Sequence, residues 1–73
     1  MQNFNLTPEQ QIMLRIEHKR AKKESASLAY RINAILLLGT GWTLEQVSNA
    51  LLLDIETLRS YVQKFQGGGV VNI

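Results

Sequence analysis

Polar side chains near the C-terminal end of the chain have the types and spacing that DNA recognition needs. They fall within residues 57–64 and comprise Thr57, Arg59, Ser60, Gln63 and Lys64. Arginine can pair with guanine and glutamine with adenine, whereas lysine and serine can contact phosphate. The group is therefore a candidate DNA-binding site, although a helix face that only meets solvent can have the same composition.

A second group of basic side chains lies earlier in the chain, in the sequence HKRAKK. Its lysine and arginine members are Lys19, Arg20, Lys22 and Lys23. Such a cluster could hold a phosphate backbone, and because each neutralised phosphate releases counterions, it would make binding steeply salt-dependent. The solvated end of a helix can carry the same residues. The net charge of +2 permits a polyanionic partner without requiring one.

Composition excludes several other kinds of chemistry. The chain has no cysteine, and its one histidine, His18, would need three further ligands to hold zinc. We therefore predict no metal, no cofactor and no small-molecule ligand. No apolar run approaches the roughly 20 residues that span a bilayer, and the N-terminus lacks the pattern of a secretory signal. We expect a cytoplasmic protein without a membrane partner, associated with the nucleoid if it binds DNA.

Two similar motifs predict where helices begin. In TPEQ, Thr7 can cap a helix while Gln10 reaches back to complete a capping box, and Pro8 suits the first helical position. TLEQ repeats the arrangement with Thr43 and Gln46. A helix should begin directly after each of these threonines.

The first helix has an apolar side only in its first half. Ile12, Met13 and Ile16 recur there at near-helical spacing, and the helix then becomes polar and basic. Serines prefer helix caps to helix interiors, so the sequence ESAS at residues 24–27 is expected to end this helix.

A broad apolar stripe over residues 28–38 predicts a second helix at the centre of the core. Gly39 and Gly41 should end it, because glycine takes the positive φ that a helix C-terminus and a tight connection require. Trp42 and Tyr61 are interpreted as core residues, with base stacking as a remote alternative.

The last helix has the clearest pattern. Placed at roughly 100° intervals, its apolar residues fall in one sector of about 120°, and the candidate DNA-binding side chains lie opposite them. The apolar set is Ile55, Leu58, Tyr61, Val62 and Phe65. Asp54 is expected to cap this helix. Leu52 occupies the preceding turn, where glycine is usual, so either the turn is built differently or the leucine bears a left-handed conformation that costs about 1–2 kcal/mol.

These elements predict one small all-α domain, because 73 residues cannot support two hydrophobic cores. The expected architecture is a bundle of about four helices that contains a helix-turn-helix, over residues 1–66. Residues 67–73, which begin with three glycines, are expected to form a flexible tail or the start of a linker.

Three segments resemble, in order and spacing, the N-terminal DNA-binding region of bacterial insertion-sequence transposases related to the mariner group. The segments are LTPEQ at 6–10, YRINAILLLGTGWTLEQVSNAL at 30–51 and TLRSYVQKFQGGGV at 57–70. The resemblance implies a homeodomain-like or paired-like helix-turn-helix that recognises the terminal inverted repeats of a mobile element. Two departures, the leucine at Leu52 and a last helix with few arginines, imply modest DNA affinity.

In that family a larger catalytic domain with three metal-binding carboxylates follows the DNA-binding region. The six acidic residues of this chain are all accounted for by helix caps and surfaces, so we expect the chain itself not to be an enzyme. The predicted function is sequence-specific binding of double-stranded DNA.

An alternative function is a protein-interaction or dimerisation module with little DNA affinity, or a small transcription regulator. If Leu53 takes the buried position in the turn, Leu52 would point outward. An exposed Leu52 beside Leu37 or residues 70–71 could then seed a homodimer.

Overall fold

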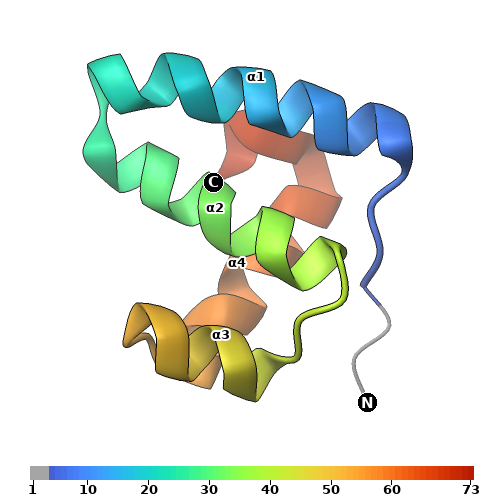
Figure 1. Cartoon of the computed structure of the whole chain (residues 1–73), viewed down its shortest axis with the longest axis vertical. Coiled ribbons are helices and arrows are strands. Elements are labelled where there is room, and N and C mark those ends of the chain that lie inside the picture. The colour runs from blue at the N-terminus through green and yellow to red at the C-terminus, as the bar shows by residue number, and fades with distance from the viewer. Residues whose placement is uncertain (1–3) are drawn as a thin grey trace.

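The computed structural model describes residues 4–73 of the chain, and this part contains helices and no strand. The prediction of an all-α domain with four helices is confirmed (Figure 1). A short 3-10 helix, η1, follows the fourth helix. The elements are α1 Pro8–Glu24, α2 Ala26–Gly39, α3 Leu44–Leu51, α4 Ile55–Gly68 and η1 Gly69–Asn72.

Side-chain caps set the beginnings of α1 and α3, as predicted. The backbone N–H of Gln10 donates to Thr7 Oγ1 over 3.1 Å, and the N–H of Thr7 donates to Gln10 Oε1 over 2.9 Å. Thr43 and Gln46 form the same pair of bonds at 2.9 and 3.0 Å. Each box satisfies backbone donors that a helix N-terminus leaves free, so these motifs fix where the helices begin.

The predicted break within residues 24–27 is confirmed and lies at Ser25. This residue has extended backbone angles, with φ −154° and ψ 106°, and it ends α1 and caps α2 at once. Its hydroxyl accepts a hydrogen bond from the N–H of Leu28 over 3.3 Å. One serine therefore turns the chain back so that α2 packs along α1.

The core is centred on α2, as the apolar stripe predicts. Ile32, Ala34 and Ile35 have no exposed surface, and α2 contacts α1, α3 and α4. The other helices and the segment before α1 contribute further buried side chains, namely Leu14, Val47, Leu58, Phe4 and Leu6. The rings of Phe4 and Phe65 meet edge to face with centroids 6.0 Å apart, which ties the first described residues to α4.

The side of α1 that faces the core is not the one its apolar residues suggest. Leu14 and Ala21 are buried, whereas Ile12, Met13 and Ile16 are 59%, 64% and 61% exposed. Ala21 and Ala29 are both buried close to the turn at residue 25, and two such small side chains allow α1 and α2 to approach closely. Close contact between the helices therefore decides which side of α1 is buried.

Gly39 and Gly41 both serve the connection after α2, but only Gly41 has a positive φ, at 113°. Gly39 is the last helical residue, and a Cβ placed on it would lie 2.3 Å from Cγ of Leu6. The N–H of Leu6 also donates to the Gly39 carbonyl over 3.1 Å. Gly39 is therefore needed because the segment that contains Leu6 approaches the end of α2 closely. The prediction of a positive φ at Gly39 is wrong.

The turn between α3 and α4 has a leucine, Leu52, in a left-handed conformation. Leu52 has φ 57° and ψ 46° and is 89% exposed. The backbone N–H groups of Leu52 and Leu53 both donate to the carbonyl of Ser48, the second over 3.1 Å. The Ser48 hydroxyl donates to the Leu53 carbonyl, and Leu53 is partly buried against the core. Of the two alternatives for this turn, the strained leucine is the one observed.

Residues 67 and 68 end α4, and residues 69–72 form η1, which packs against α4. The Asn72 side chain donates to the Lys64 carbonyl over 2.8 Å, and Arg31 donates to the Ile73 carbonyl over 3.3 Å. Val70 and Ile73 are partly buried against the core. The division into a domain at 1–66 and a tail or linker at 67–73 stays a prediction.

Candidate nucleic-acid interface

The polar face of α4 consists of the candidate side chains on the side away from the core. Arg59, Gln63 and Lys64 are exposed, while Thr57 and Ser60 are partly covered. Leu58, next to Arg59 in the chain, has no exposed surface. A buried leucine on one side of the helix fixes the direction in which the residues on the other side project. The three most polar members of the predicted group therefore reach solvent together.

Arg59 forms an ion pair within α4. Its Nη1 lies 3.0 Å from Oε2 of Glu56, and the two side chains are 61% and 83% exposed. An exposed pair of this kind contributes about 0–1 kcal/mol, so an incoming acceptor can replace it at little cost. Asp54 occupies the N-cap position directly before α4, as predicted, but its side chain makes no capping hydrogen bond. Two acidic residues, Asp54 and Glu56, thus lie at the start of α4 and balance the charge of the two basic residues of the polar face, Arg59 and Lys64.

Contacts on the inner side hold α4 in one orientation. The Arg31 guanidinium of α2 lies 5.8 Å from the ring centroid of Tyr61, a distance at which a cation attracts the face of an aromatic ring. Tyr61 is partly buried against the core, which fits its interpretation as a core residue. The Tyr30 hydroxyl of α2 donates to the Leu51 carbonyl at the end of α3. Side chains of α2 therefore position both α3 and α4.

The basic residues of α1 are not brought to the polar face of α4. Lys19, Arg20, Lys22 and Lys23 are all exposed. In Figure 1 the end of α1 that carries them lies across the long dimension of the molecule from α3 and the first turns of α4. The two groups of predicted DNA-binding residues therefore occupy separate surfaces.

Arg20 is the one member of the basic cluster with a carboxylate partner in the described residues. It forms a hydrogen-bonded ion pair with Glu17, one helical turn earlier. The hydrogen bond from Arg20 lowers the pKa of the Glu17 carboxyl, and the same bond raises the pKa of Arg20. Part of the positive charge at this end of α1 is therefore neutralised locally.

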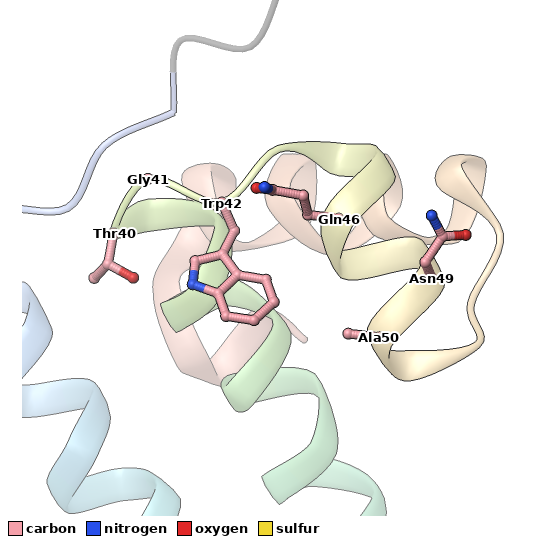
Figure 2. Close-up of a pocket in the computed structure, with 6 residues that line it drawn as sticks. All are labelled: Thr40, Gly41, Trp42, Gln46, Asn49 and Ala50. Carbon is pink, nitrogen blue, oxygen red and sulfur yellow. The ribbon is translucent and has the colours of Figure 1, made fainter.

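Trp42 is 40% exposed, so its interpretation as a core residue is wrong. It lies in an open hollow between the α2–α3 connection and the outer side of α3, lined by Thr40, Gly41, Trp42, Gln46, Asn49 and Ala50 (Figure 2). Figure 2 shows the indole between Thr40 and Ala50. Trp42 directly precedes the capping threonine of α3, so it lies in the connection outside the helix and is only partly covered.

The hollow adds polar groups that belong to neither group of predicted DNA-binding residues. The sequence predicts a role for Gln46 only in the capping box, and it predicts none for Asn49. Both project from α3 on the side away from buried Val47, three residues apart, and this spacing was the available signal. No charged side chain lines the hollow, so it lacks the groups that dominate phosphate binding.

The described residues contain no group of three or more His, Cys, Asp or Glu side chains that could hold a metal ion. Among them, no helix is long and apolar enough to cross a bilayer. No protein-family model matches the chain, and comparison with curated proteins and with solved structures finds no similar chain.

Proposed function

We propose that the chain is a module that binds double-stranded DNA by placing the polar face of α4 in the major groove. The observation that carries the proposal is the exposure of Arg59 and Gln63 on α4, the second of two helices joined by a short turn. In helix-turn-helix proteins the second helix of such a pair lies in the major groove. The 14 residues of α4 give a helix of about 21 Å, and the major groove, about 12 Å wide, admits one α-helix.

The spacing of Arg59 and Gln63 suits two base pairs that are separated by one other base pair. Residues four apart in a helix are separated by about 6 Å along its axis, close to two base steps of about 3.4 Å each. In this arrangement Arg59 exchanges Glu56 for the O6 and N7 atoms of a guanine, and Gln63 pairs with an adenine. Lys64 and Ser60 contact phosphate, and Thr57 lies at the end of α4 that enters the groove first.

Affinity should be modest. The two acidic residues near the start of α4 repel phosphate, and the basic residues of α1 lie on a separate surface. The sequence resemblance favours the inverted ends of a mobile element as the target. We assign binding and no catalysis to this chain. A small transcription regulator would use the same face of α4 on a different DNA site.

An electrophoretic mobility shift assay at two salt concentrations tests the proposal. The probe is a pool of random-sequence duplexes, and a single-stranded pool of the same length is the control. We expect a shift with duplex at 50 mM salt that weakens several-fold at 200 mM, because phosphate contacts release counterions. A protein that shifts no duplex at either salt concentration is not a DNA-binding module.

The alternative function, a protein-interaction module, is favoured by a different observation, which is the exposed apolar side of α1. This observation does not involve the polar face of α4. The two functions are therefore compatible within one domain.

A further inference from the structure

The outer face of α1 is the side of this helix that turns away from the rest of the domain. At 100° per residue, its members lie within about 60° of Ile16, opposite the buried Leu14 and Ala21. In order along the helix they are Glu9, Ile12, Met13, Ile16, Lys19, Arg20 and Lys23. Figure 1 shows α1 as an outer layer with the other helices all on one side of it.

This face combines a central apolar patch with a negative charge at its N-terminal end and positive charges at its C-terminal end. Ile12, Met13 and Ile16 form one contiguous patch of large side chains, each about three-fifths exposed. Ile16 also lines a shallow, mainly apolar hollow with the stems of Lys19, Arg20 and Lys23. Single exposed apolar residues are common on protein surfaces, whereas a contiguous group of three large ones is typical of protein-interaction sites.

We propose that the outer face of α1 binds the same face of a second copy of this chain, in antiparallel orientation about a two-fold axis near Ile16. The charges on the face select this partner. Glu9 lies seven residues before Ile16 and Lys23 seven residues after it, so the antiparallel pair places each Glu9 opposite Lys23 of the other copy. The apolar patches of the two copies then meet at the centre.

The parallel orientation lacks this complementarity. It would place Glu9 against Glu9 of the other copy, and like charges in direct contact repel. Lys19, Arg20 and Lys23 would likewise each face the same residue of the other copy. In the antiparallel pair the two basic clusters lie at opposite ends, with Lys23 of each copy about 21 Å along the axis from Lys23 of the other. The stems of Lys19 and Arg20 can then cover the partner's Met13 and Ile12 while their charged ends stay in water.

The size of the face sets the expected strength of the dimer. One side of one 17-residue helix falls short of the roughly 800 Å² per partner of a stable complex, so association should be weak and concentration-dependent. The first turns of α4 lie across the molecule from α1, so pairing through α1 leaves both polar faces of α4 accessible. The dimer would not depend on DNA.

Sedimentation equilibrium of the free protein from 5 µM to 1 mM tests this inference. We expect the weight-average mass to rise from monomer toward dimer across this range. Ile16→Lys should weaken association at least tenfold without lowering the melting temperature, because Ile16 is exposed in the monomer. Leu52→Lys is the matched control: it adds the same charge at a strongly exposed leucine outside α1, and association should not change.

A charge exchange tests the orientation. Glu9→Lys should weaken association, and the double variant Glu9→Lys/Lys23→Glu should restore it, because only the antiparallel pair brings the two positions together. A protein that stays monomeric at 1 mM would overturn the inference. So would a dimer that Leu52→Lys disrupts and Ile16→Lys does not. Failure of the double variant to recover association would overturn the antiparallel arrangement.

Discussion

The outer sides of α4 and α1 have opposite compositions, although both helices pack on α2. α4 buries its apolar residues around Leu58 and presents Arg59, Gln63 and Lys64 to solvent. α1 buries Leu14 and Ala21 and leaves its apolar patch exposed. A polar outer face with arginine and glutamine suits a base-pair edge, whereas an apolar outer face suits another protein surface. One small domain can therefore offer two surfaces to two kinds of partner.

Substitutions on the buried side of α4 and on the outer side of α1 should differ most in their effect on the free energy of unfolding. Leu58→Ala should lower the free energy of unfolding by about 2–5 kcal/mol, because it removes a fully buried side chain beneath the polar face of α4. Ile16→Ala should change it by no more than about 0.5 kcal/mol, since exposed substitutions rarely do more. Urea denaturation followed by circular dichroism, at low protein concentration, measures both. Similar losses for the two variants would mean that the outer face of α1 is buried in the monomer.

A pair of glycine substitutions compares the contact between the end of α2 and the segment before α1 with the end of α4. Gly39→Ala should cost about 1–3 kcal/mol, because the added Cβ would overlap the Leu6 side chain at 2.3 Å. Gly67→Ala is the control, since its Cβ would meet only Asn72 Nδ2 at 3.5 Å and alanine favours the helix. Thermal unfolding of both variants is the measurement. A neutral Gly39→Ala would show that the Leu6 segment can move away without cost.

A substitution in the turn before α4 should change the free energy of unfolding by a smaller amount, and it should stabilise the fold. Leu52→Gly should raise the free energy of unfolding by about 1 kcal/mol, because it relieves a left-handed leucine that buries almost no surface. DNA binding should not change, since the turn keeps its geometry. The control is Leu53→Gly, which should destabilise the fold by removing a partly buried side chain. A destabilising Leu52→Gly would show that the leucine makes a contact that compensates its strain.

Features with local causes could be predicted from the sequence. The two capping boxes, the break at Ser25 and the apolar stripe of α2 each depend on residues within a few positions of one another. The role of Gly39 could not be predicted, because it depends on Leu6, which is distant in the chain. The buried side of α1 could not be predicted either, since the helix has apolar residues on both sides and packing against α2 decides between them.

The candidate site also has features that could be predicted from the sequence and features that could not. The exposure of Arg59 and Gln63 follows from the helical period of α4, because the buried side of that helix is uniformly apolar. The separation of Lys19–Lys23 from α4 depends on how α1 and α4 are arranged around α2, and no local pattern contains that information. The exposure of Trp42 likewise depends on whether another element covers it.

Selection of DNA sequences from a random duplex pool by the wild-type protein and by Arg59→Ala tests the central claim most directly. Lys19→Ala/Lys23→Ala, which alters the other surface, is the matched control. We predict that the wild type enriches a site with a defined guanine, that Arg59→Ala loses preference at that position with affinity reduced about tenfold or more, and that the control variant keeps the site. An Arg59→Ala protein that selects the same site with the same affinity would contradict the assignment of α4 as the recognition helix.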